Sequence, residues 1–172
     1  MNKTKALLLF AVLVLVGIFS RWIPHPPNFT ALLAVAIYAG FVLPPLAALA
    51  TPVLAAVLGD LWLGTHEGMW VVYLSLIALV FVGRVLTVPG KSPRRWLSWG
   101  LAGLSGSVVF YVTTNLFVWW SSGMYPHTAD GLISCFVLAI PFFHNSVLST
   151  WLFMGAFEAV RQLVPASKTV TA

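Results

Sequence analysis

The chain is a succession of long apolar segments separated by short polar ones. A helix needs about 20 predominantly apolar residues to cross the hydrocarbon core of a bilayer. We therefore predict an all-α integral membrane protein, a bundle of six transmembrane helices forming a single transmembrane domain over 1–172. The predicted spans are about 6–20, 30–43, 45–63, 69–88, 97–120 and 141–163, with a partial helix at about 131–140.

Prolines mark several of the breaks between these segments. Three prolines between Arg21 and Thr30 forbid a continuous helix there and predict an extended, rigid loop. Pro44 and Pro45 end the second span and suit the first turn of the third. Pro141 interrupts the last apolar region, so that the piece before it is too short to cross alone and leads into the final span.

Composition supports the membrane prediction. Of the 172 residues, 60% are hydrophobic and 8% are charged, whereas a soluble domain carries about 25% charged residues. The net charge of +5 raises the question of nucleic acid. However, basic excess in a membrane protein normally marks cytoplasmic loops, and no aromatic and basic surface occurs outside the apolar runs. We therefore exclude nucleic acid as a partner. The single cysteine excludes an internal disulfide.

Charge asymmetry predicts the orientation. With six spans and both termini in the cytoplasm, the outer side receives Arg21 as its single basic residue. The cytoplasmic side then receives Lys3, Lys5, Lys91, Arg94, Arg95, Arg161 and Lys168, with Arg84 close to it. The outer side also receives Asp60, Glu67, Asp130 and all four histidines. We expect a multi-pass protein of the bacterial inner (cytoplasmic) membrane.

Small residues recur at every fourth position on three spans. They are Ala47, Thr51, Ala55 and Gly59 on the third, Ala36 and Gly40 on the second, and Gly103 and Ser107 on the fifth. Such residues let helices approach closely in lipid. Packing within the chain is the favoured interpretation, and a docking face for a partner membrane protein is the alternative.

Uncommon polar residues gather where the fifth span ends and the last begins. A charged group at bilayer depth costs roughly 2.5–3.5 kcal/mol on insertion scales and so needs a partner, water or a function. Asp60 is either an interfacial cap or a cavity group paired with Arg21. Asn115 either hydrogen-bonds a neighbouring helix or faces a ligand.

Aromatic side chains with a few polar groups are typical of small-molecule sites. The predicted substrate-binding residues are Arg21, His25, Asn28, Asp60, Asn115, Trp119, Trp120, Tyr125, His127, Asp130, His144 and Asn145, the first three as rim or lid.

Motifs for other chemistry are missing from the sequence. There is no Gly-x-Ser-x-Gly, no His-Glu-x-x-His and no phosphate-binding loop. We therefore predict no enzyme, no cofactor and no ATP hydrolysis by this chain. Metal ligands would have to come from four separate segments without ligand spacing, which leaves a metal-binding protein or intramembrane enzyme as a minor alternative.

Four segments carry a resemblance to a known family. They are Arg21-x-Ile-Pro-His-Pro-Pro-Asn-Phe-Thr30, Asp60-Leu-x-Leu-Gly64, Thr114-Asn115-x-x-Val-Trp119 with Tyr125-Pro126, and Ile140-Pro-Phe-Phe-x-Asn145. Together they resemble an uncharacterised bacterial family of six-helix predicted transport proteins. That family in turn resembles the substrate-binding (S) components of energy-coupling factor vitamin transporters.

The resemblance implies a protein that captures a micronutrient from outside, with a transmembrane coupling subunit and ATPases supplying energy. S components often present Ala-x-x-x-Ala on the first helix for docking. Here the comparable stripe lies on the third span. A structural membrane scaffold, which would tolerate changes throughout the outer cluster, is the other alternative.

Overall fold

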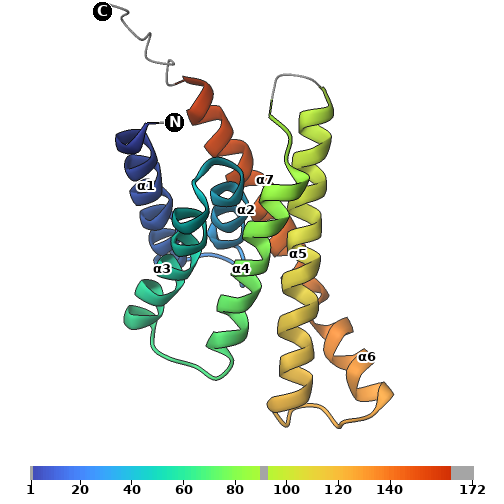
Figure 1. The fold of residues 1–172 in the computed structure, drawn as a ribbon. Helices are drawn as coiled ribbons and strands as arrows, with labels where there is room; N and C mark the ends of the chain where they lie inside the picture. The colour runs from blue at the N-terminus through green and yellow to red at the C-terminus, as the bar shows by residue number, and fades with distance from the viewer. Residues whose placement is uncertain (1, 90–92, 164–172) are drawn as a thin grey trace, which may run out of the picture.

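The computed structural model describes residues 2–89 and 93–163, which form seven α-helices (Figure 1). The protein is thus all-helical over its described residues. The helices are α1 (Lys3–Trp22), α2 (Leu32–Val42), α3 (Pro45–Leu63), α4 (Met69–Leu86), α5 (Pro93–Ser121), α6 (Ala129–Leu138) and α7 (Ile140–Leu163).

The structure contains four candidate membrane spans among its described residues, or five if the bent pair α6 and α7 is one span, whereas the sequence predicted six. Helices α1, α3, α4 and α5 are each long and apolar enough to cross a bilayer. Helices α6 and α7 pass the same test only together, as one span bent by 43°. Helix α2 has 11 residues, or roughly 16 Å at 1.5 Å per residue, which is about half the hydrocarbon thickness. The helices are compatible with a multi-pass membrane protein.

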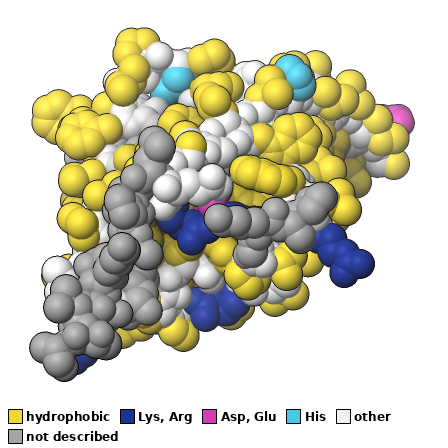
Figure 2. Space-filling view, turned by 90° about the horizontal axis from the view of Figure 1, so that it is seen from above, with side chains coloured by type: hydrophobic (Ala, Val, Ile, Leu, Met, Phe, Trp, Pro, Cys, Tyr) yellow, Lys and Arg dark blue, Asp and Glu magenta, His cyan; other side chains and the backbone are white. Residues whose placement is uncertain are grey.

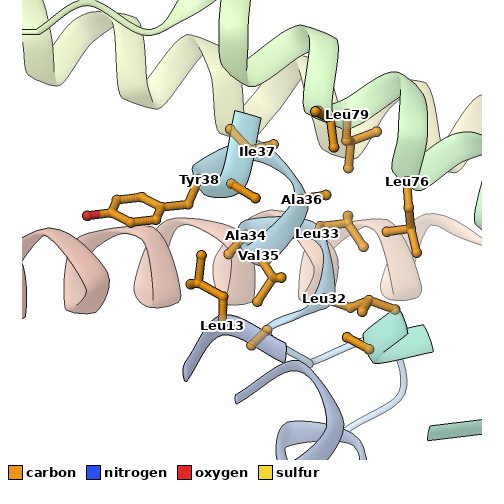
Figure 3. Packing of buried hydrophobic residues seen from close by; sticks show 14 of the residues in the cluster. Leu13, Leu32, Leu33, Ala34, Val35, Ala36, Ile37, Tyr38, Leu76 and Leu79 are labelled. Atoms are coloured by element: carbon orange, nitrogen blue, oxygen red, sulfur yellow. The ribbon is translucent and has the colours of Figure 1, made fainter. Parts of the chain in front are cut away.

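The short helix α2 forms the centre of the molecule. Every residue from Leu32 to Gly40 is buried, and α2 packs against α1, α3, α4, α5 and α7. Figure 3 shows its side chains pointing in all directions into neighbouring helices. A helix that is apolar on all sides is a buried one. Because other helices enclose α2, its length need not match the bilayer, and the apolar run of α2 does not by itself show that this helix spans a membrane.

The helix directions bring the start of α1 and the end of α7 to the same end of the bundle. Helices α1 and α3 pack side by side and run the same way, while α2 returns between them. The start of α1 and the end of α7 therefore lie at one end, at the top of Figure 1. We call this the basic end, because it carries Lys3, Lys5, Arg94, Arg95 and Arg161.

Figure 2 looks onto the basic end and shows Lys and Arg side chains there. Arg84 lies in the last turn of α4 and donates from Nη2 to the carbonyl oxygen of Leu43 (2.9 Å), at the end of α2. Lys91 and Lys168, which were predicted on the same side, lie outside the described residues. The opposite end carries the α3–α4 connection (64–68) and the α5–α6 connection (122–128), and we call it the loop end.

Glycines let the central helices touch. A methyl group on Gly40 of α2 would lie 2.1 Å from the carbonyl oxygen of Val80 on α4, and one on Gly83 would lie 1.9 Å from that of Ile37. On the third-span stripe, Ala55 is fully buried, and a methyl group on Gly17 of α1 would lie 2.8 Å from its Cβ. Packing within the chain is thus confirmed as the role of these stripes, and the α3 stripe is not free to receive a partner.

Candidate functional site

A cavity of about 710 Å³ lies at the loop end. Its walls come from the end of α1, the α1–α2 connection, the start of α2, the end of α3, and from α4, α5, α6 and α7. Exposed residues of the connections, including His25, Asn28, His66 and Met124, line its mouth. Its volume falls within the range of about 300–1,000 Å³ that is usual for small-molecule sites.

Aromatic side chains make up much of the cavity wall. Phe110 and Tyr111 come from α5, and Phe142 and Phe143 come from the first turn of α7. The Tyr111 hydroxyl donates to the carbonyl oxygen of Phe136, and its ring lies 4.9 Å from that of Phe143, centroid to centroid. This hydrogen bond and this ring contact hold the Tyr111 ring of α5 against α6 and α7 on one side of the cavity.

Asn115, one of the predicted substrate-binding residues, lines the cavity from α5. Its Nδ2 donates to the carbonyl oxygen of Tyr111 (2.8 Å), one turn earlier on the same helix. The expected side-chain bond to a neighbouring helix is therefore wrong for this amide. The neighbouring Thr114 also lines the cavity and donates to its own helix, at the carbonyl of Phe110 (2.7 Å). Among the described residues, the Asn115 side-chain oxygen accepts no hydrogen bond.

Arg21 and Asp60 form the pair that the sequence suggested. Arg21 Nη2 lies 2.5 Å from Asp60 Oδ1, and its Nη1 donates to the carbonyl oxygen of Ala56 (3.0 Å). The second carboxylate oxygen accepts from the Tyr73 hydroxyl (2.7 Å). Arg21 lines the cavity while Asp60 lies behind it, 3% exposed. A methyl group on Gly59 would lie 2.5 Å from Arg21 Nη1, so glycine leaves room for the pair.

The proline-rich loop forms part of the mouth and is fastened to α7. Asn145 Nδ2 donates to the carbonyl oxygen of Pro27 (2.9 Å). Asn28, which follows Pro27 in the chain, adopts a left-handed backbone conformation (φ 61°) that Asn tolerates better than most residues. His25 and Asn28 line the cavity, in agreement with a rim, whereas Asn145 is absent from its wall and holds the loop in place.

Trp119 and Trp120, which follow Asn115 and were predicted to bind substrate, hold the α5–α6 turn and are absent from the cavity wall. Trp119 Nε1 donates to the carbonyl oxygen of Pro126 (3.1 Å). Trp120 stacks on His127 with ring centroids 5.3 Å apart and planes at 9°, and Trp120 is 67% exposed. Tyr125 is the member of this stretch that reaches the cavity.

Asp130 and His144 also lie away from the cavity wall. Asp130 is exposed in the first turn of α6, where a carboxylate complements the helix dipole. His144 is exposed on α7. Of the twelve predicted residues, five line the cavity, namely Arg21, His25, Asn28, Asn115 and Tyr125. Within residues 2–89 and 93–163, no group of three His, Cys, Asp or Glu side chains is placed to hold a metal ion.

Several residues that line the cavity were not predicted, because they are neighbours of Asn115 on the surface of α5 and not all of them are its neighbours in the sequence. Phe110, Tyr111, Thr114 and Val118 share one face of α5 with Asn115. Tyr111 and Val118 lie four and three positions from Asn115, and Phe110 and Val118 each lie four positions from Thr114, which are the spacings of one helical face. Starting from Asn115, that periodicity would have identified them. Cys135 and Ser146 had no comparable signal.

A second polar cluster, at the basic end, was not predicted. Glu158 of α7 is fully buried and accepts hydrogen bonds from Arg161 Nε (2.7 Å), Arg161 Nη2 (2.9 Å) and Gln162 Nε2 (3.0 Å). It also forms an ion pair with the buried Arg95 of α5. The guanidinium of Arg95 lies 5.1 Å from the centre of the Trp99 ring. This cluster ties α5 to α7 on the side of the molecule away from the cavity.

Comparison with curated proteins and with solved structures gave no significant match. A family profile does match, and it spans residues 1–171, which is nearly the whole chain. The chain therefore belongs to DUF6580, a family of unknown function.

Proposed function

We propose that this protein captures a small solute in the loop-end cavity for uptake across the bacterial inner membrane. The observation that supports it is the cavity itself: about 710 Å³, walled by aromatic and aliphatic side chains and provided with a few polar groups. This combination is typical of sites for small molecules. Positive residues concentrate at the opposite end, which favours a cavity that opens outside the cell.

Energy for uptake comes, in this proposal, from a separate partner. The sequence has no phosphate-binding loop, and its likeness to S components suggests a transmembrane coupling subunit with ATPases. The small-residue stripe on α3 is buried against α1, so it is not available for that contact. We therefore place the coupling surface on another, lipid-facing part of the bundle.

The test is to purify the full chain in detergent and to identify co-purified small molecules by mass spectrometry. Thr114→Trp would fill the cavity from α5, and Val112→Trp would add the same bulk on the exposed side of the same helix. We expect a solute with the unaltered protein and with Val112→Trp, and its loss with Thr114→Trp.

A solute that remains bound to Thr114→Trp would place the site elsewhere. Absence of any solute from the unaltered protein, together with unchanged growth phenotypes for Thr114→Trp, would favour the structural scaffold.

A further inference from the structure

The charge around the cavity is of one sign. Three of its lining residues, Arg21, His25 and His66, are basic. Among the described residues, no Asp or Glu lines it. Arg21 is partly buried, so water screens its charge less than at an open surface, whereas His25 and His66 are exposed at the mouth. The cavity is therefore better suited to an anion than to a cation.

The nearest carboxylate, Asp60, offsets the charge of Arg21 but has no free oxygen to offer a ligand. Asp60 uses one oxygen for Arg21 and the other for Tyr73, and it is 3% exposed. Glu67 follows His66 but is exposed and is not part of the wall. Asp130 is exposed in the first turn of α6, also outside the wall. A cationic ligand would therefore meet Arg21 without a free carboxylate to compensate.

Arg21 has N–H groups that are not used in the hydrogen bonds to Asp60 and Ala56. A guanidinium carries five N–H groups, and two of them are used for Asp60 and Ala56. The ion pair with Asp60 holds the side chain in one orientation at the cavity wall. A held guanidinium with free N–H groups is well suited to binding a carboxylate.

The rest of the cavity requires an apolar partner. Phe110, Phe142 and Phe143 present rings to it, and such rings favour offset-stacked or edge-to-face contact with another ring. The ligand must therefore combine an anionic group with a flat hydrophobic body.

We propose that the cavity binds an organic acid, with its carboxylate at Arg21 and the histidines of the mouth and its ring against the phenylalanines. This inference rests on the proposed function and names the class of solute for the same site. It excludes amines and metal cations as the principal ligand.

The first test uses matched probes of one ring system: 1-naphthylacetate, 1-naphthylacetamide and 1-naphthylethylamine. Binding to the purified full chain is measured by thermal shift and by displacement of any co-purified solute. We expect the acid to bind about tenfold more tightly than the amide, or more, because charge-assisted hydrogen bonds are about twice as strong as neutral ones. The amine should bind most weakly.

Histidine variants provide a matched pair that does not disturb the Arg21–Asp60 ion pair. His66→Gln changes a cavity residue on an exposed connection, and His144→Gln changes an exposed histidine outside the cavity. We expect His66→Gln to weaken binding of the acid without weakening that of the amide, and His144→Gln to change neither.

The outcomes separate this inference from the function on which it rests. A co-purified solute with an acidic group supports both. A neutral or basic solute that Thr114→Trp excludes, or an amide or amine probe that binds as tightly as the acid, overturns the organic-acid assignment and leaves solute capture standing. Absence of a co-purified solute together with no binding of any probe overturns both.

Discussion

Two buried carboxylates hold the bundle together, one at each end. Asp60 joins α3 to Arg21 of α1 and to Tyr73 of α4 near the cavity. Glu158 joins α7 to Arg95 of α5 at the basic end. Removing one member of a buried ion pair leaves the other uncompensated, which is more costly than the net stabilisation by the pair. Both residues are therefore expected to be sensitive to substitution.

Glu158→Ala should strongly destabilise the protein. It would remove the carboxylate that forms an ion pair with the buried Arg95, and breaking a buried ion pair costs about 3–5 kcal/mol. Unfolding in detergent, followed by circular dichroism, measures the effect. Glu67→Ala, at an exposed position, is the control and should be near neutral. Equal stability of the two variants would show that the cluster contributes little.

Asn145→Ala should loosen the mouth of the cavity without unfolding the bundle. It removes the bond to the Pro27 carbonyl (2.9 Å), and a hydrogen bond of this kind contributes about 1 kcal/mol, or roughly fivefold in local opening. Hydrogen exchange of a peptide covering 23–31 should become faster by that factor. His144→Ala alters the adjacent exposed residue and should leave exchange unchanged. Equal exchange in both variants would mean that the loop is held by other contacts.

At the scale of elements, the helix positions follow from the sequence, but the role of α2 does not. Apolar runs bounded by prolines predicted helices close to α1, α3, α4 and α5, and the break before Pro141. Hydrophobicity does not distinguish burial in lipid from burial in protein, so α2 was predicted as a span. The site shows the same limit: Asn115 was identified, but the face it shares with Tyr111 depends on helix rotation.

A substitution at the contact between α2 and α4 tests whether the backbone of the central helix packs closely against its neighbour. Gly83→Ala would place a methyl group 1.9 Å from the Ile37 carbonyl oxygen, so the two backbones would have to separate. Overpacking of this kind typically costs about 1–3 kcal/mol. Gly100→Ala, on α5, meets nothing within 4 Å and should be neutral or slightly stabilising. Similar unfolding midpoints for both variants would contradict the close packing.

At the scale of the whole molecule, the two ends differ in chemistry. At the basic end, Glu158 joins α7 to Arg95 of α5, and this end carries most of the positive charge. The loop end carries the cavity, and connections with exposed residues line its mouth. A protein that takes a solute from outside the cell needs the loop end to face outward. The direction of the bundle in the membrane is thus the premise on which the uptake proposal depends.

Cysteine labelling in intact cells tests this premise most directly. In a Cys135→Ser background, Met124→Cys would report on the cavity mouth and Gln162→Cys on the basic end, and both positions are exposed. We predict that a membrane-impermeant maleimide labels Met124→Cys in intact cells and labels Gln162→Cys only after permeabilisation. The reverse pattern would direct the cavity toward the cytoplasm and contradict solute capture from outside.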